Sequence, residues 1–471
     1  MQKFTKTNLT ILQKYANINL TILQKLEVKL FKRKIYNRML EWKKTYDGKS
    51  ALLIEGPRRV GISTIVEQFA KNEYDSYILI DFYTASQQTK KLFDDLSDID
   101  YIISALQLEY KTSLTKRKSV IVFDEVQLCP KARGSIKALV KDGRFDYIET
   151  GSLISIRKNV KDILIPSEEH KLKMYPFDYE EFRWALGDNV TSGLLHSYFE
   201  NLKPFGQDMH RKLMRDFNLY MLVGGMPQAV DAYVNTRDFN KVDLIKRDIL
   251  SLYLDDFRKI DPSGKISMLF KSIPAQLMGN KSRFNVSSVI KSTRANNVLE
   301  QITQLNDSGT VNVAYHANDP NAGLSHSINL EKFKLYVADT GLFITLAFMD
   351  KEFVDNEIYS DLLFGRAGVN LGYVYENVVA QTIVSNGKSL YYYTFLNEKS
   401  RHNYEIDFIL TSGRKICPIE VKSSSHMKHA SLDAFFEKYS SRIATKYLLS
   451  KRDCGKDKDV VCLPIYMTQF L

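Results

Sequence analysis

Two glycines and a serine in the first part of the chain have the spacing of a phosphate-binding loop. Gly56 and Gly61 fit the pattern G-x-x-x-x-G-K-[ST], and Ser63 stands where a hydroxyl that binds Mg²⁺ is expected. The glycines let backbone N–H groups face a phosphate, which the N-terminus of the following helix also attracts. Ile62 replaces the lysine that contacts the β- and γ-phosphates, so the sequence leaves open whether the chain hydrolyses ATP. The loop predicts an ATP and Mg²⁺ site with these contacts: Gly56, Pro57, Arg58, Arg59, Val60, Gly61, Ile62, Ser63, Thr64 and Ser152.

Two adjacent carboxylates follow an apolar segment further along the chain. Asp124 and Glu125 come directly after residues 119–123. At such a place an aspartate holds Mg²⁺, and a neighbouring carboxylate polarises the attacking water. We therefore predict Ser63 and Asp124 as metal ligands and Glu125 as a catalytic residue. The alternative is an ordinary strand end at the surface, and the phosphate-binding loop upstream favours the functional interpretation.

Four further side chains are candidates for contacts with the phosphates. Ser152, or else Thr150, would contact the γ-phosphate from the end of the next strand. Arg58 and Arg59 lie inside the loop and would supply positive charge that partly offsets Ile62. Side chains at those two loop positions commonly point outwards, so the sequence leaves their role open.

A second group of charged residues lies in the C-terminal part of the chain. Asp407 and the run Glu420-Val421-Lys422 fall on two strands joined by a hairpin, and Glu420 and Lys422 share one face because the strand period is two. Carboxylates suit Mg²⁺, which can activate water against a phosphodiester while the lysine orients that water. We predict a nuclease site with catalytic Asp407, Glu420 and Lys422 and with Glu376, Asp407 and Glu420 as metal ligands. The alternative is a nuclease fold whose site has lost its task.

Short apolar runs alternate with helical segments in the first third of the chain, which predicts a parallel sheet with helices on both faces. Ligands bind beyond the carboxyl ends of the strands in such sheets. Gly56, Asp124 and the segment Thr150-Gly151-Ser152 all fall at those ends. The predicted strands are 51–54, 77–82, 119–123 and 147–152.

The middle of the chain has a mostly helical pattern, broken at Gly224-Gly225 and Pro227. Two short helices and a two-stranded wing follow, which is typical of a winged helix whose second helix can enter a major groove. That helix carries few arginines, so a purely structural winged helix is the favoured interpretation. The predicted segments are helices 180–253, 285–291 and 295–305 and strands 310–314 and 333–337.

The C-terminal part has the pattern of an α-β-β-β-α-β unit that would carry the second charged group. The predicted segments are helix 373–384, strands 390–394, 404–410 and 416–422, helix 432–439 and strand 447–449.

Composition limits the class of protein. The 471 residues exceed one ordinary core, so about three domains are expected, and the 44% hydrophobic and 26% charged residues indicate a soluble globular protein. We expect no membrane segment, and four scattered cysteines favour a reducing cytoplasm. The net charge of +11 favours DNA as a partner, although a lysine-rich solvated surface gives the same value. The expected divisions are a helical or disordered extension at 1–33, a P-loop domain at 34–190, a helical and winged-helix region at 191–345 and a nuclease-like domain at 355–471.

By its motifs the chain resembles a bacterial and archaeal AAA-type P-loop ATPase family with a C-terminal domain of unknown function. The C-terminal part resembles the PD-(D/E)xK restriction-endonuclease-like fold. The resemblance runs from about residue 34 to the C-terminus and implies ATP binding, Mg²⁺ and association with DNA. Ile62 and the N-terminal extension depart from the family pattern. The matching motifs are Gly56-Pro57-Arg58-Arg59-Val60-Gly61, Phe123-Asp124-Glu125-Val126-Gln127, Glu149-Thr150-Gly151-Ser152, Val223-Gly224-Gly225-Met226-Pro227, Tyr336-Val337-Ala338-Asp339-Thr340-Gly341-Leu342 and Ile419-Glu420-Val421-Lys422.

The sequence thus predicts an α/β multidomain protein in which an ATP-binding AAA-type domain is coupled to a nuclease-like, DNA-directed domain. One alternative is a nucleotide-insensitive scaffold, or pseudo-ATPase, that assembles partners or a homo-oligomer. Another is a Mg²⁺-dependent DNA nuclease that acts without ATP.

Overall fold

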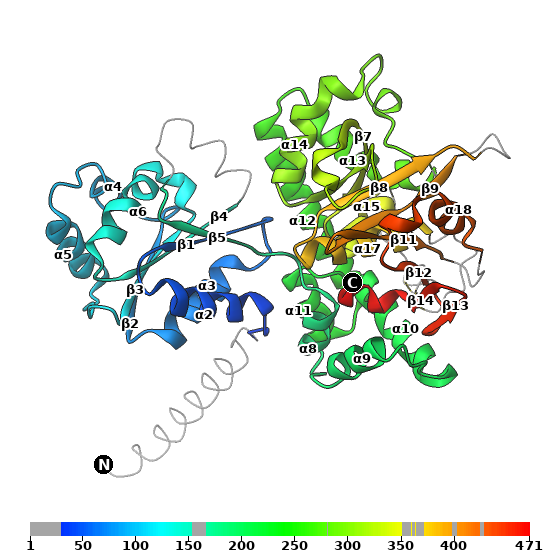
Figure 1. Ribbon diagram of the computed structural model, residues 1–471. Coiled ribbons are helices and arrows are strands. Elements are labelled where there is room, and N and C mark those ends of the chain that lie inside the picture. The colour runs from blue at the N-terminus through cyan, green and yellow to red at the C-terminus, as the bar shows by residue number, and fades with distance from the viewer. Residues whose placement is uncertain are drawn as a thin grey trace, which may run out of the picture. The chain divides into compact units, whose positions relative to one another are not determined.

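The computed structural model (Figure 1) divides into Met1–Lys32 and Arg33–Leu471. The predicted N-terminal extension at 1–33 falls almost wholly outside the described residues, and the described helices and strands all belong to the second unit. The structure describes residues 30–152, 166–279, 281–350, 359, 363, 372–397, 403–423 and 428–471.

A five-stranded sheet in the order β2-β3-β4-β1-β5 follows the N-terminal helix, and all its pairings are parallel. The parallel sheet and the four predicted strands are confirmed. The fifth strand, at one edge, was missed because its sequence Glu-His-Lys-Leu-Lys is largely polar. The strands are β1 (Ala51–Gly56), β2 (Ser76–Asp81), β3 (Ser119–Asp124), β4 (Asp146–Ser152) and β5 (Glu169–Lys173).

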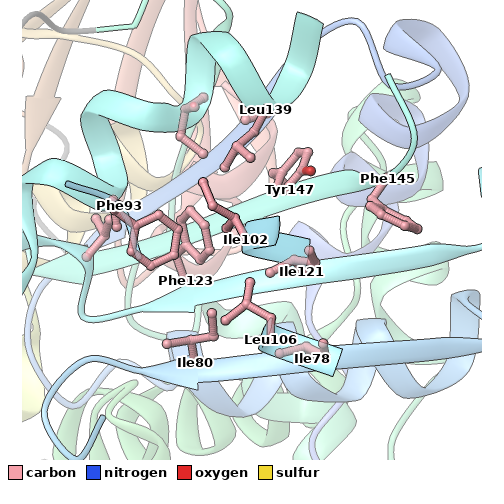
Figure 2. Close-up of a cluster of buried hydrophobic side chains, with 14 of the residues drawn as sticks. Ile78, Ile80, Phe93, Ile102, Leu106, Ile121, Phe123, Leu139, Phe145 and Tyr147 are labelled. Carbon is pink, nitrogen blue, oxygen red and sulfur yellow. The ribbon is translucent and has the colours of Figure 1, made fainter. Parts of the chain in front are cut away.

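Helices cover both faces of this sheet and give it two hydrophobic cores. One core joins the strands to α2 (Lys34–Tyr46) and α3 (Ile62–Glu73). The other lies under α5 (Ile99–Tyr110) and α6 (Pro130–Asp142), where Ile121 and Phe123 of β3 meet Ile102 and Leu139 (Figure 2). β1 and β3 are buried along their whole length, which explains the apolar runs Ala51–Ile54 and Val120–Phe123.

The middle region is helical, as predicted. The helix before Gly224 ends there because Gly224 adopts a φ of 82°. A Cβ on Gly225 would lie 2.3 Å from the carbonyl oxygen of Phe177, so the chains approach closely at this break. The helices are α8 (Tyr179–Ala185), α9 (Thr191–Glu200), α10 (Gln207–Val223), α11 (Pro227–Thr236), α12 (Phe239–Ile260), α13 (Lys265–Met278), α14 (Leu299–Asp307) and α15 (Thr340–Ala347).

The segment expected to form a winged helix differs from the prediction in two ways. The predicted helix 285–291 is wrong: only the 3₁₀ turn Val286–Ser288 forms there, and the Ser288 hydroxyl donates to the Asn285 carbonyl instead. The hairpin of β6 (Val311–Ala317) and β7 (Ile328–Val337) is confirmed. However, β6 also pairs with β8 (Leu390–Phe395), so the hairpin belongs to a four-stranded sheet shared with the C-terminal part.

The C-terminal part contains α17 (Gly372–Ser385) and a second mixed sheet in the order β10-β11-β12-β14-β13. The single strand predicted at 404–410 is broken at Asp407. Its first half pairs with β8 and its second half with β11, so the two halves belong to different sheets. The remaining elements are β9 (Tyr404–Ile406), β10 (Phe408–Ser412), β11 (Lys415–Val421), α18 (Ala430–Tyr439), β12 (Lys446–Ser450), β13 (Gly455–Asp457) and β14 (Val460–Pro464).

Within the described part of the chain, no helix is both long and apolar enough to cross a bilayer. Cys129, Cys417, Cys454 and Cys462 are buried free thiols.

Candidate functional site

The phosphate-binding loop joins the end of β1 to the start of α3. Gly61 caps α3 with a φ of 95°, and Arg59 also has a positive φ of 68°. A Cβ on Gly56 would lie 2.6 Å from the carbonyl oxygen of Met174, so only glycine fits there. The first N–H groups of α3 have no partner within the helix and are free to face an anion.

Three side chains from three elements meet beside the loop. Ser63 on α3 donates its hydroxyl to Asp124 Oδ1 at 2.8 Å. Thr150 on β4 donates to the same oxygen and accepts the backbone N–H of Glu125 at 3.2 Å. Asp124 and Thr150 are buried, whereas Ser63 is exposed. The carboxylate is therefore fixed by two neutral hydroxyls, one of which faces solvent.

Glu125 follows Asp124 in the left-handed region, with a φ of 54°. Burial raises the pKa of Glu125, and the charge of Asp124 raises it further, while a hydrogen bond from the Gln127 amide opposes the shift. Glu125 lines a cavity of about 350 Å³ with the loop, Thr150 and Gly151. The structure thus places Asp124 and Glu125 at the loop, at the carboxyl ends of the strands.

Ile62, at the lysine position, is apolar and cannot supply a positive charge to the phosphates. Ile62 packs against the core that α2 and α3 share, and its Cδ1 would lie 3.4 Å from a Cβ on Gly56. Arg58 pairs with Asp256 of α12 at 2.9 Å, and its carbonyl accepts the Tyr253 hydroxyl at 3.1 Å. The described residues that line the loop cavity therefore include no lysine, and the guanidinium of Arg58 is engaged elsewhere.

The remaining predicted contacts line the loop with different exposures. Pro57 and Val60 are buried, whereas Arg59 and Thr64 are exposed. Ser152 is the register partner of Gly56, but its side chain lies outside the described residues. Thr150, the alternative to Ser152 in the sequence analysis, binds Asp124.

The carboxylates of the second predicted site lie close together, but they do not converge on one position. Asp407, at the break between β9 and β10, accepts the Val421 N–H at 2.7 Å through Oδ2. Glu420 is buried on β11 and pairs with Lys422 at 2.5 Å. Glu376 on α17 accepts the Tyr336 hydroxyl at 3.3 Å. Within the described residues, no group of three or more His, Cys, Asp or Glu side chains is arranged to hold a metal.

Sequence analysis missed two residues of this cluster, Lys334 and Glu405. Lys334 is buried on β7, 3.6 Å from Glu376, and it also pairs with Glu405 on β9. Burial alone would lower the pKa of Lys334, but Glu376, Glu405 and Asp407 raise it well above its usual value. The alternation Lys334-Leu335-Tyr336 on a strand was the available signal, but it does not identify the partner of the lysine.

Charge in the cluster is unbalanced, with four carboxylates (Glu376, Glu405, Asp407 and Glu420) and two ammonium groups (Lys334 and Lys422). Burial raises the pKa of Asp407 well above its usual value, and Glu376 raises it further. Glu420 Oε2 is buried without a hydrogen bond among the described residues. Asp407 and Glu420 therefore fit a divalent cation by charge, whereas Glu376 is held by Lys334 and Tyr336.

Three families match different parts of the chain. Residues 48–183 match a AAA domain, residues 214–352 a domain of unknown function (DUF8612), and residues 371–467 a domain of unknown function (DUF4143). The chain therefore contains a AAA-type P-loop domain followed by two regions that match domains of unknown function. The AAA match covers the parallel sheet and the Ser63–Asp124 site.

No curated protein matches the chain. Among solved structures it is similar to a Walker-type ATPase of Pyrococcus abyssi, at 15% identity and a TM-score of 0.40 over 68% of this chain and 97% of that chain. The ORC1 protein of Aeropyrum pernix in complex with DNA is similar at 12% identity and a TM-score of 0.28, over 70% of this chain and 94% of that chain. A signal-transduction ATPase with a tetratricopeptide repeat sensor from Pyrococcus horikoshii is similar at 11% identity and a TM-score of 0.28, over 76% of this chain and 50% of that chain.

Proposed function

We propose that the P-loop domain binds Mg²⁺–ATP and that Ile62 leaves it a slow or inactive hydrolase. The observation that carries this proposal is the contact between Ser63 and Asp124 at 2.8 Å, beside a loop that lines an open cavity of about 350 Å³. A serine hydroxyl and a strand-end carboxylate are the usual protein ligands of Mg²⁺ in P-loop sites.

The residues present fit a triphosphate and its metal. The loop between Gly56 and Gly61 would hold the phosphates through backbone N–H groups, which need no lysine. Ser63 and Asp124 would hold Mg²⁺, which neutralises phosphate charge when bound. Thr150 keeps Asp124 oriented towards Ser63.

Hydrolysis depends on two further groups. Glu125 lies at the cavity and would polarise an attacking water, and its raised pKa makes it a stronger base once ionised. The ammonium that would contact the transferring phosphate is replaced by Ile62, and Arg58 is bound to Asp256. We therefore expect binding to survive better than turnover, because binding uses the backbone.

Calorimetry of Mg²⁺–ATP on the natural protein and on Asp124→Ala tests this function. We expect binding in the micromolar range for the natural protein and loss of binding in the variant. Asp81→Ala is the matched control, because Asp81 pairs in register with Asp124 on the neighbouring strand and its carboxylate accepts from Tyr83 and Thr84. A natural protein that binds no nucleotide would favour the scaffold, or pseudo-ATPase, interpretation.

A second function is metal-dependent cleavage of DNA by a nuclease-like C-terminal part. The observation that favours it is the buried, unbonded Glu420 Oε2 in a cluster of four carboxyl groups and two ammonium groups. Asp407 and Glu420 would hold a divalent cation, which activates water when bound. Lys422 would orient that water through its contact with Glu420.

Cleavage of supercoiled plasmid DNA in Mg²⁺ or Mn²⁺ without ATP tests this second function. We expect the natural protein to nick the plasmid and Glu420→Gln to be inactive, with the exposed Glu437→Gln as the control. Equal nicking by Glu420→Gln and the natural protein would show that the cluster takes no part in cleavage. The absence of cleavage by every variant would favour a nuclease-like fold without the activity.

A further inference from the structure

Three adjoining cavities form a groove along β5, the β6–β7 hairpin and the turn between α17 and β8. The largest is about 940 Å³, and the others are about 350 Å³ and 340 Å³. The first two share Lys173 and Tyr175, the last two share Lys388 and Tyr391, and all three share Gly387. These shared walls make the groove continuous.

The uncompensated charge of the groove is mainly positive. Arg38, Lys173 and Lys388 are exposed on its walls and form no ion pair within the described residues. Two of its acidic residues are already neutralised, because Asp178 pairs with Lys34 at 2.6 Å and Glu181 with Arg33 at 3.2 Å. The third, Glu55, is buried at the end of β1. An anionic chain would therefore meet free cations at both ends of the groove.

Aromatic rings line the groove together with these cations. Tyr175, Tyr315 and Tyr391 line the groove, and each is partly exposed. Partly exposed rings beside free cations suit unpaired nucleobases joined by phosphates, because every base has a face that stacks on an aromatic ring. A duplex keeps its base faces stacked and offers mainly its phosphates.

The groove is separate from the carboxylate cluster. It passes the C-terminal end of α17 at Ser385, whereas Glu376 lies about 14 Å away along that helix at 1.5 Å per residue. On β10 it reaches from Thr411 to Ile409, which lies about 7 Å along the chain from Asp407. None of the four carboxylates of the cluster lines any of the three cavities.

We propose that this groove binds single-stranded nucleic acid through Arg38, Lys173 and Lys388, with bases stacked on Tyr175, Tyr315 and Tyr391. The lysines and the arginine neutralise the phosphates, and the tyrosines accept any base. Binding is therefore independent of sequence and falls steeply with salt. It requires neither ATP nor a divalent cation, so it stands apart from both functions proposed above.

Fluorescence anisotropy with a labelled oligothymidylate of roughly 16 nucleotides, in EDTA and without ATP, tests the proposal. The full chain should bind the single strand more tightly than a duplex of the same length. Lys173→Glu with Lys388→Glu should weaken binding at least tenfold and lower the salt slope by about 0.7 for each lost phosphate contact. Lys456→Glu with Lys458→Glu, a matched exposed pair on the β13–β14 hairpin, should leave it unchanged.

The stacking part is tested separately with Tyr315→Leu and Tyr391→Leu, each checked for folding by its melting curve. Each should weaken binding about tenfold without a change in the salt slope. Equal loss in the groove pair and the control pair would overturn the proposal, as would tighter binding to the duplex or no binding at all. A failure here leaves the Mg²⁺–ATP titration unaffected, so the two results are distinguishable.

Discussion

The phosphate-binding loop and the C-terminal cluster hold their carboxylates in opposite ways. At the loop, Asp124 is fixed by the hydroxyls of Ser63 and Thr150, and the position of the cation is taken by Ile62. In the cluster, Lys334 and Lys422 pair directly with carboxylates. One site lacks its expected ammonium, and the other has an ammonium that its motif did not predict.

The difference shows where a cation can be lost without loss of the fold. The loop faces an open cavity that Glu125 lines, and two hydroxyls hold Asp124 when no cation is near. Lys334 is buried, and its partners would keep their charges in a medium where an unpaired ion is costly. Replacement of the loop lysine is therefore a change in function, whereas replacement of Lys334 would be a change in stability.

The largest expected effect is that of Lys334→Met. This change leaves Glu376 and Glu405 without their ammonium, and breaking a buried ion pair costs about 3–5 kcal/mol. Urea unfolding followed by circular dichroism measures the loss. Lys332→Met, two residues earlier on the same strand and partly exposed, is the matched control and should change the free energy of unfolding by less than about 0.5 kcal/mol. Similar losses in the two variants would contradict the comparison.

The next effect concerns the open site. Ile62→Lys restores a charge-assisted contact with the phosphates, so Mg²⁺–ATP should bind more tightly by about 1.5–3 kcal/mol. Calorimetry measures the change, and Ile62→Met, of similar length but without charge, should bind like the natural protein. Equal affinities for Ile62→Lys and the natural protein would show that the backbone alone sets the affinity.

The residues of the phosphate-binding site that lie at the ends of strands could be predicted from the sequence. Gly56 and Asp124 end their strands, and Thr150 lies two residues before the end of β4. The ends of parallel strands meet at one edge of the sheet whatever the order of the strands. Their approach to Ser63 therefore follows from the element pattern. The hydrogen bond of Thr150 to Asp124 does not, because it depends on β3 and β4 being neighbours.

The cluster could be predicted only in part, because its members come from elements distant in the sequence. The strand period shows that Lys334 and Tyr336 share a face of β7, but not that β6 pairs with β8 and brings them to Glu376. The run 404–410 has the pattern of one strand, and the change of partner at Asp407 leaves no trace in its hydrophobicity. Long-range pairing decides both points.

A buried acid pair in the P-loop domain is intermediate between the loop and the cluster, because only one of its two carboxyl groups pairs with a cation. Glu149 lies beside Glu169, and one guanidinium, that of Arg133, pairs with Glu169 at 2.9 Å. Burial raises the pKa of Glu149 well above its usual value, and Glu169 raises it further. The folded state thus keeps a proton that the unfolded state releases above about pH 4.3. The free energy of unfolding should therefore fall as pH rises from that value through the raised pKa, by up to about 1.4 kcal/mol per pH unit.

Glu149→Gln should remove this fall, so its stability relative to the natural protein should increase between about pH 5 and about pH 8. Urea unfolding across that range measures the difference, and the exposed Glu331→Gln is the control. A variant whose relative stability does not change with pH would mean that Glu149 titrates alike in both states.

The smallest expected effect is that of Ser63→Ala, and it tests the comparison most directly. Thr150 still holds Asp124 in this variant, and water replaces the exposed hydroxyl, so the free energy of unfolding should fall by no more than about 0.5–1.5 kcal/mol. The dependence of ATP binding on Mg²⁺ should fall as well, and Ser63→Thr should restore it because the hydroxyl is kept. Calorimetry with and without Mg²⁺ separates these outcomes. A loss of stability comparable to that of Lys334→Met would mean that the loop carboxylates, like those of the cluster, depend on a partner that solvent cannot replace.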